Sequence, residues 1–400
     1  MKLPKAAWQA RRGLRDLLAT LGAAEGETRF VGGCVRDTLL GLPVNDIDLA
    51  TRLAPAEVLE RLQRARIKAV PTGLAHGTVT AVVEGKPVEV TTLRRDVSTD
   101  GRRATIAYTD DWREDAARRD FTINALSADP ASGEIFDYFG GRADVEERLV
   151  RFIGDPLVRI AEDHLRILRF FRFHARFGRG EPDGAALEAC AARANDLMAL
   201  SRERIADELL KLLSLPEPGP TARLMVERAI LRPVLPEIDA AGVAALERLA
   251  GREAAAGVAP DPLRRLAALL PPDPALAGSV AARLRLSKRA ARRLVAAAGR
   301  GGEAGDPAVL AYRLGPEEAI DRILLGGGEA AAARALNDWV RPRLAIGGGD
   351  LISLGLAAGP IVARTLQAIE EEWAQSGFPA AEAQRAIARR HVDQALRERQ

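Results

Sequence analysis

Two aspartates one residue apart, Asp46 and Asp48, are the residues of this sequence best suited to metal chemistry. They lie in a predicted strand over 46–51, where side chains alternate between faces. Both carboxylates should therefore point the same way, while Ile47 and Leu49 enter a core. Like charges on one face repel, and a cation between them relieves the repulsion. Because Mg²⁺ takes oxygen ligands and keeps positions for phosphates, the pair predicts a Mg²⁺ site with both aspartates as catalytic ligands.

A glycine turn precedes this strand. Gly32 and Gly33 follow the apolar pair Phe30 and Val31 and open a segment of helix length. Glycines let backbone N–H groups approach a phosphate closely, and a helix N-terminus behind them attracts the same anion. Either feature alone is common, since many Gly-Gly pairs are plain turns and many Asp-x-Asp pairs lie on solvated edges. Together, the strand, glycine turn, helix and second strand predict a triphosphate cradle beside a metal site, as nucleotidyl transfer requires.

A third carboxylate, Glu89, belongs to another predicted strand. β-Branched residues predict strands over 78–83 and 88–93, joined by a turn at 84–86. Glu89 shares one face of its strand with Thr91. It is therefore either a third catalytic carboxylate beside the aspartate pair or a solvent-facing residue.

Helices and strands alternate in the part of the chain that must position these side chains. Apolar spacing predicts helices over 4–22 and 55–64, so a small mixed sheet backed by helices is expected up to about residue 141. Residues 94–111 are polar and charged, with Asp-Gly-Arg-Arg at 100–103. They predict either a mobile loop near the site or a surface loop without function.

A dense run of charges at 114–120 leads directly into an apolar segment, so some of these charges must lie near the sheet. Arg119 is suited to neutralising triphosphate oxygens, because a guanidinium is permanently charged and binds bidentately. Asp120 is suited to accepting a hydrogen bond from a ribose hydroxyl.

Beyond residue 142 the sequence predicts almost only helices. The most informative one is predicted over 159–177, with Ile160, Ile167 and Phe171 on one apolar face. Between residues 159 and 179 its two acids, Glu162 and Asp163, are outnumbered by arginines at 159, 166, 169, 172, 176 and 179. Such an excess of arginine points to a ligand, and the alternative is an ordinary amphipathic helix with intrahelical ion pairs.

These blocks resemble class II CCA-adding enzymes, the tRNA nucleotidyltransferases that share a family with bacterial poly(A) polymerases. The resemblance covers about residues 28–180 and is carried by four blocks, in order Gly-Gly-Cys-Val-Arg-Asp at 32–37 with Asp46-Ile47-Asp48, Asp-Gly-Arg at 100–102, Arg-Arg-Asp-Phe-Thr-Ile-Asn-Ala-Leu at 118–126, and Glu-Asp-His-Leu-Arg at 162–166.

The resemblance implies a role for each matching residue. Asp46 and Asp48 would hold the catalytic metals for an in-line, two-metal transfer that releases pyrophosphate. The nucleotide would be bound by Gly32, Gly33, Arg36, Arg119, Asp120, Asp163, Arg166, Arg169 and Arg172. Among these, Arg119 and Asp120 would handle phosphate and the ribose 2′-hydroxyl. Asp163 and Arg166 would form a protein template for the Watson–Crick edge of the incoming base.

The resemblance also implies an α+β fold in four parts. A nucleotidyltransferase head would span 1–141 and a helical neck with the base template 142–215. A helical, RNA-binding body would span 216–330, and a helical, tRNA-binding tail 331–400. Within the body, a predicted basic helix with no acid carries Arg283, Arg285, Lys288, Arg289, Arg292 and Arg293. These residues are predicted to bind RNA phosphates, and a solvated basic face is the alternative.

Composition adds the cellular setting. Hydrophobic residues make up 47% and charged residues 28% of the 400, with a net charge of +3, as in globular proteins that function in water. No run approaches the ~20 apolar residues of a membrane span, so no membrane partner is expected. Two cysteines, Cys34 and Cys190, fit a reducing cytoplasm better than a disulfide framework.

The expected activity is addition of CCA to the tRNA 3′ end from CTP and ATP, with recognition of the tRNA elbow by the tail. The intact 100–102 block and the segment 71–78 favour full addition by resemblance. A poly(A) polymerase, an enzyme that adds only CC or only A, and a catalytically inactive RNA-binding protein are the alternatives.

Overall fold

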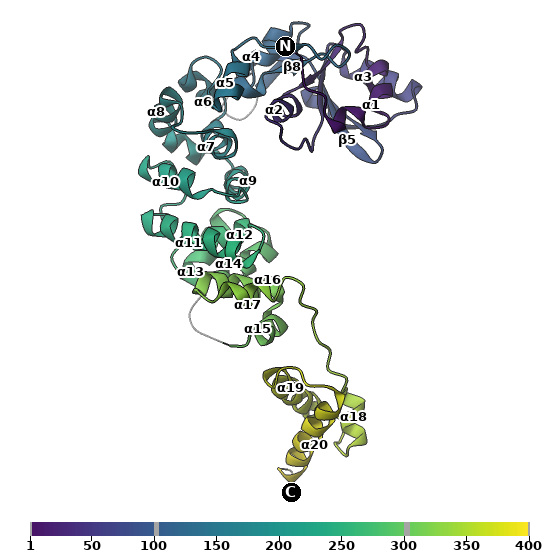
Figure 1. Ribbon diagram of the computed structural model, residues 1–400, viewed down its shortest axis with the longest axis vertical. Helices are drawn as coiled ribbons and strands as arrows, with labels where there is room; N and C mark the ends of the chain where they lie inside the picture. Colours follow the sequence, from purple (N-terminus) through teal and green to yellow (C-terminus); the bar gives the residue numbers. More distant parts are fainter. Residues whose placement is uncertain (1, 100–103, 300–304, 399–400) are drawn as a thin grey trace. The chain divides into compact units, whose positions relative to one another are not determined.

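A computed structural model describes residues 2–99, 104–299 and 305–398 of the chain. The chain divides into two compact units, Met1–Leu212 with Pro220–Pro236, and Leu213–Gly219 with Glu237–Gln400. Every strand of the described residues belongs to the first unit, and the second is helical (Figure 1). This confirms the α+β class, whereas the division into head, neck, body and tail stays a prediction.

The first unit is built on a seven-stranded mixed sheet of order β3-β4-β5-β2-β1-β8-β9. Its strands are β1 (Thr28–Val31), β2 (Asp48–Thr51), β3 (Lys68–Gly73), β4 (Thr78–Val83), β5 (Lys86–Thr92), β8 (Ser127–Ala128) and β9 (Ile135–Phe136). Only β2 and β5 pair in parallel; the other neighbours are antiparallel. The strand predicted over 46–51 begins at Asp48, so Asp46 lies just outside the hydrogen-bonded ladder.

Helix α3 (Pro55–Arg64) confirms the prediction over 55–64 and packs against β3 and β4. The helix predicted over 4–22 is wrong, because the chain forms a short 3₁₀ turn (Ala7–Ala10) and then α1 (Leu14–Thr20). Gly13 between them has φ 75°, in the left-handed region that ends regular helix. Leu14 and Leu17 of α1 are buried, whereas the 3₁₀ turn contributes an edge-on contact of Trp8 with Phe30.

Residues 94–99 and 104–108 form a two-stranded antiparallel ribbon, β6 (Arg94–Thr99) and β7 (Ala104–Tyr108), so the predicted loop is wrong for these residues. A ribbon outside the main sheet has no face that must be apolar throughout, so its strands lack the usual alternation. The Asp-Gly-Arg-Arg block at 100–103 lies outside the described residues.

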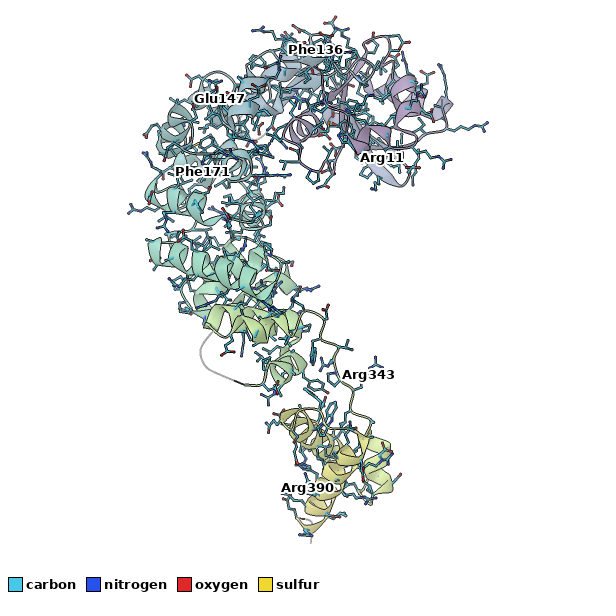
Figure 2. The ribbon with its side chains drawn as sticks, in the orientation of Figure 1. Arg11, Phe136, Glu147, Phe171, Arg343 and Arg390 are labelled. Carbon is cyan, nitrogen blue, oxygen red and sulfur yellow. The ribbon has the colours of Figure 1, made fainter. Side chains whose placement is uncertain are left out.

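The segment after the ribbon is mostly helical: α4 (Trp112–Ala117), a 3₁₀ turn (Thr122–Asn124), α5 (Gly141–Glu147), α6 (Pro156–Glu162) and α7 (Arg166–Phe177). The continuous helix predicted over 159–177 is wrong. It breaks at Asp163, whose backbone is extended (φ −153°) and whose carboxylate accepts a hydrogen bond from the Leu165 amide at 3.1 Å. The apolar face is confirmed, because Ile160, Ile167 and Phe171 are fully buried. Phe171 is labelled in Figure 2.

Further helices complete the first unit and build the second. They are α8 (Gly184–Ala192), α9 (Arg202–Leu213), α10 (Gly219–Glu227), α11 (Ala240–Ala256), α12 (Pro262–Leu269), α13 (Pro274–Arg283), α14 (Lys288–Ala298), α15 (Pro307–Leu314), α16 (Pro316–Gly326), α17 (Ala330–Arg334), α18 (Gly348–Ser353), α19 (Pro360–Gln375) and α20 (Ala381–Arg397), with a 3₁₀ turn at Ala194–Ala199. None of the helices in the described ranges is long and apolar enough to cross a membrane.

The second unit encloses a network of buried charges between α11, α12, α14 and α16. Glu253 accepts hydrogen bonds from Arg264 and Arg265, each at 2.8 Å. Asp321 accepts from Arg264 at 2.7 Å and from Arg293 at 2.6 Å. These five residues are all buried, and their opposite charges offset much of the cost of removing them from water.

Candidate active site

The structure brings Glu89 to the aspartate pair. Asp48 on β2 and Glu89 on β5 are direct register partners in the one parallel pairing of the sheet, so their side chains lie on the same face. Asp46 is exposed just before β2, and Ile47 and Leu49 are buried, as the alternation predicted. The opposite face of β5 is also as predicted, since Val88 and Val90 are buried there while Glu89 is exposed.

The carboxylates of this acid cluster (Asp46, Asp48 and Glu89) repel one another. Burial, then the charge of Glu89 and that of Asp46, raise the pKa of Asp48 to about 6, against the opposing effect of Arg119. Among the described residues, no three His, Cys, Asp or Glu side chains are gathered tightly enough to hold a metal ion by themselves. Mg²⁺ ordinarily takes one or two carboxylates together with water and substrate phosphates. Two aspartates under mutual repulsion fit such an ion.

The glycine turn has the geometry that the sequence predicted. Gly32 has φ 67° and ψ −122°, and helix α2 (Gly33–Leu39) begins directly after it. A Cβ atom on Gly32 would lie 2.9 Å from Nη1 of Arg119, so a larger residue would displace that arginine. The turn therefore holds a guanidinium against the start of a helix, on the β1 side of Asp48.

Arg119 is held from behind by Asp115, which the sequence analysis did not select. The buried Asp115 carboxylate accepts hydrogen bonds from Arg118 at 2.8 Å, from Arg119 at 3.3 Å and from the backbone amide of Arg94 at 3.3 Å. The one available signal was its place in the charge run at 114–120, four residues before Arg119, a spacing that brings side chains together on a helix. Asp115 thus joins the base of the β6–β7 ribbon to a predicted phosphate ligand.

A chain of hydrogen bonds links Arg36 on α2 to Arg169 on α7. Arg36 donates to the side-chain oxygen of Asn124, and the Asn124 amide donates to Asp120 at 2.8 Å. Arg169 donates to the other oxygen of Asp120 at 2.8 Å. Burial opposes ionisation of Asp120, but Arg169 and Asn124 outweigh it and hold the pKa of this carboxyl below its usual value.

Asn124 is a second residue that the sequence analysis missed, although it lies inside a quoted block. Both oxygens of the buried Asp120 already accept hydrogen bonds, one of them also from the Phe121 amide. The contact of Asp120 with a ribose hydroxyl stays a prediction. In this structure the Asp120 carboxylate binds Arg169 directly and holds Arg36 through Asn124.

The predicted base template, Asp163 and Arg166, lies between the end of α6 and the first residue of α7. Asp163 is partly exposed and accepts from Arg204 at 2.8 Å. Arg166 is buried, and its guanidinium donates to the backbone oxygens of Arg159 and Arg118. Arg204 was not selected from the sequence, because it is 41 residues away from Asp163.

Arg172, which was predicted to contact the nucleotide, has an acidic partner. It pairs with the buried Glu208, and both Arg169 and Arg172 lie over the ring of Phe173. The nucleotide contacts of Arg166, Arg169, Arg172 and Asp163 stay predictions. Their ion pairs show that an excess of arginine counted over 159–179 is partly balanced by acids on other helices.

The predicted basic helix around residues 283–293 is wrong as a single element. Helix α13 ends at Arg283, Arg285 adopts φ 51° in the connecting turn, and α14 begins at Lys288. Arg283 pairs with Glu237 and Arg289 with Glu317, while Arg293 is buried on Asp321. Arg285, Lys288 and Arg292 remain exposed. Arg289 is exposed as well, so burial argues against an RNA contact for Arg293, and the contacts of the other residues stay predictions.

Comparison with known proteins agrees with this geometry. Residues 28–151 match the family model described as the poly A polymerase head domain, and residues 181–241 match one described as a probable RNA and SrmB-binding site of polymerase A. The chain is 34% identical to the mitochondrial CCA tRNA nucleotidyltransferase 1 of Mus musculus, over 94% of this chain and 90% of the relative. It is 42% identical to a CCA-adding enzyme of Oceanobacillus iheyensis over 49% of this chain and 48% of the relative.

Solved structures show the same fold. The CCA-adding enzyme of Bacillus stearothermophilus in complex with CTP superposes with a TM-score of 0.75 at 27% identity, covering 97% of this chain and 99% of the other. A Thermotoga maritima CCA-adding enzyme complexed with tRNA shares the fold at a TM-score of 0.64 and 21% identity, covering 97% of this chain and 95% of the other. The acid cluster, the glycine turn and these matches together establish that the chain belongs to the class II CCA-adding enzymes, the CCA tRNA nucleotidyltransferases.

Proposed function

We propose that this protein adds CCA to the 3′ end of tRNA, using CTP and ATP and releasing pyrophosphate. The register pair of Asp48 and Glu89, beside the Gly32 turn, is the observation that carries the proposal. Family membership supports tRNA and nucleoside triphosphates as partners. The Mus musculus relative, which aligns over 90% of its length, is named as a CCA tRNA nucleotidyltransferase.

Asp46 and Asp48 are the proposed ligands of Mg²⁺, and Glu89 is a third catalytic carboxylate. When bound in pairs, such ions activate an attacking hydroxyl and neutralise charge on the leaving group. The chain itself supplies position and charge: the Gly33 amide, Arg36 and Arg119 hold the triphosphate oxygens. Catalysis on this proposal is orientation plus electrostatic stabilisation.

The reaction is a direct displacement. The 3′-hydroxyl oxygen of the RNA forms a bond to the α-phosphorus of the nucleotide and loses its proton to solvent. The bond from that phosphorus to the pyrophosphate oxygen breaks as the new bond forms. The RNA hydroxyl is the nucleophile, so the mechanism requires no covalent intermediate with the chain.

Base choice is assigned to Asp163 and Arg166, with Arg169 and Arg172 as further nucleotide contacts. A carboxylate accepts from an exocyclic amine and a guanidinium donates to a ring nitrogen or carbonyl, so the pair suits cytosine and adenine and rejects uracil. Asp163→Ala should therefore raise misincorporation of UMP by about tenfold while changing the KM for CTP less. An equal loss of activity with all four nucleotides would contradict the template role; Asp16→Ala, an exposed acid on α1, is the control.

The tRNA body is assigned to the second unit. Arg285, Lys288 and Arg292 are proposed to contact RNA phosphates, and the segment 331–400 is proposed to recognise the tRNA elbow by shape. We also propose a cytoplasmic location, which is supported by the two free, buried thiols of Cys34 and Cys190.

The deciding experiment incubates the protein with tRNA that lacks its 3′ end, plus CTP, ATP and Mg²⁺, and sequences the products. Addition of CCA followed by arrest is the expected result. Products that end after two cytidines, or long adenosine tails, would instead assign a partial adder or a poly(A) polymerase.

A further inference from the structure

Beside the acid cluster, strands β3, β4 and β5 present one face of the sheet that carries Glu89, on the side of β2 opposite to the glycine turn. The strand order places β5, β4 and β3 on one side of β2, and β1 with the Gly32 turn on the other. Register partners run in a straight row from Asp48 through Glu89 and Thr80 to Val70. Side chains paired in register lie on the same face, so the row extends the surface of the acid cluster outward by two strands.

Short side chains cover this face, which we call the shelf and define as Val70, Thr72, Gly73, Thr78, Thr80 and Thr91. Two hydroxyl pairs tie its strands together, Thr72 with Thr80 at 2.6 Å and Thr78 with Thr91 at 3.1 Å. The other face of the same strands is fully buried, as Val79 and Ala81 show, and packs toward α3. Thr80 at the centre of the shelf is 9% exposed, whereas Thr72 and Val70 at its outer strand are exposed. The shelf is therefore a surface of small side chains beside Glu89, open toward β3.

Larger side chains stand at the edge of the shelf. Leu74 directly follows Gly73 and is 44% exposed. Tyr108, at the end of β7, is 50% exposed, and its ring lies against Gly77, where an added Cβ would meet the ring at 2.9 Å. Among the large hydrophobic side chains that are exposed in the described ranges, Tyr108 is the only aromatic one. Lys68 is exposed on the same face of β3, two residues before Val70.

We propose that the shelf binds the single-stranded 3′ end of the RNA substrate, with a base stacked on Tyr108 and the terminal hydroxyl beside Glu89; this rests on the proposed function. In a direct displacement, the attacking and leaving oxygens lie on opposite sides of the α-phosphorus. A triphosphate held by the Gly33 amide and Arg36 directs its pyrophosphate toward β1. The hydroxyl must then arrive from the β5 side, where the shelf lies.

The chemistry of the shelf suits unpaired RNA. Every base offers a face that stacks on an aromatic ring, and such stacking tolerates any sequence. Threonine hydroxyls both donate and accept, so they can bond ribose hydroxyls or base edges as the terminal nucleotide changes from C to C to A. The Lys68 ammonium is placed to neutralise one backbone phosphate.

The test compares Tyr108→Ala with Tyr108→Phe in the full-length protein, using tRNA that lacks CCA. Tyr108→Ala should raise the KM for tRNA by about tenfold, the loss expected for one base stack, with the KM for CTP within twofold of the parent. Tyr108→Phe keeps the ring and should retain the parent values. Val158→Ala, at an apolar residue of α6 that is 53% exposed, is the matched control and should also match the parent.

A second measurement does not depend on catalysis. Parent protein without nucleotide is irradiated with tRNA that carries a photoreactive base at its 3′ terminus, and the crosslinked peptide is identified. A crosslink within 70–78 or at Tyr108 is expected. A crosslink to another segment would overturn RNA binding by the shelf, and so would a Tyr108→Ala variant whose KM for CTP rises as much as its KM for tRNA. In either case, CCA addition by the parent would still uphold the proposed function. Absence of any nucleotide addition by the parent would overturn both.

Discussion

Two clusters of charge in this protein look alike in the sequence and differ completely in the structure. In the second unit, Glu253 and Asp321 are buried against Arg264, Arg265 and Arg293, so each acid has basic partners within hydrogen-bonding distance. In the first unit, Asp48 lies in register with another acid and next to a third. Opposite charges that satisfy one another stabilise a fold, whereas like charges gathered on one face call for a ligand.

The physical causes of the pKa shifts express the same difference. Burial lowers the pKa of Arg293, but its hydrogen bond to Asp321 and the nearby acids outweigh burial and raise it. For Asp48, burial and the neighbouring acids act in the same direction and raise its pKa. The effects oppose one another in the internal network and add together in the acid cluster, which is why only the cluster gains from binding a cation.

The largest expected effect tests whether the acid cluster is required for nucleotide addition. Asp46→Ala should lower the rate of CMP addition by at least about 10³-fold, because it removes a proposed metal ligand. The thermal midpoint and the affinity for tRNA should stay near the parent values, since Asp46 is exposed. Single-turnover kinetics and filter binding measure the two effects. Asp16→Ala serves as the control, and a variant with more than a tenth of the parent rate would contradict the assignment.

The second prediction tests whether the buried charge network of the second unit stabilises the fold. Glu253→Ala leaves two buried arginines short of a partner and should lower the free energy of unfolding by about 3–5 kcal/mol. Arg289→Ala breaks an exposed ion pair of the same unit and should cost about 0.5 kcal/mol or less. Urea unfolding of both variants gives the comparison. Similar losses would show that burial does not separate the two kinds of pair.

An intermediate effect is expected for the hydrogen-bond chain of the first unit, which links Arg36 to the ion pair of Asp120 and Arg169. Asn124→Ala breaks the hydrogen-bond chain between Arg36 and Asp120 and should cost about 1–3 kcal/mol of stability. The KM for CTP should also rise about tenfold, because Arg36 loses one of the two side chains that orient it and keeps only Asp37. Unfolding and steady-state kinetics of one preparation measure both. A loss of stability with an unchanged KM would place Asn124 in the fold alone.

The smallest expected effect is a substitution that stabilises the fold, whereas most substitutions destabilise it. The pKa of Asp48 is about 6 when folded and about 3.9 when unfolded, so its ionisation destabilises the fold progressively as pH rises from about 4 to above 6. After allowance for partial exposure, Asp48→Asn should stabilise the protein by about 1–2 kcal/mol at pH 7.5 in a chelator, with little difference at pH 4. Thermal unfolding at both pH values tests this. A variant no more stable than the parent at pH 7.5 would mean that the acid cluster is not under repulsion.

Local periodicity accounts for what the sequence alone determined. Helix α3, the strands β4 and β5, the glycine turn before a helix and the burial of Ile47 and Leu49 were all predicted, because each depends on neighbours within a few residues. A period of two or 3.6 residues decides which side chains face a core before any long-range contact forms.

Only the tertiary structure decided the partners. The parallel pairing that sets Glu89 beside Asp48 joins strands about 40 residues apart, and no local pattern specifies that register. The break at Asp163, its pair with Arg204 and the internal position of Arg293 have the same origin, since a charge finds its partner through the packing of distant helices. The side chains that could do chemistry were visible in the sequence, and the fold determined which of them stand together.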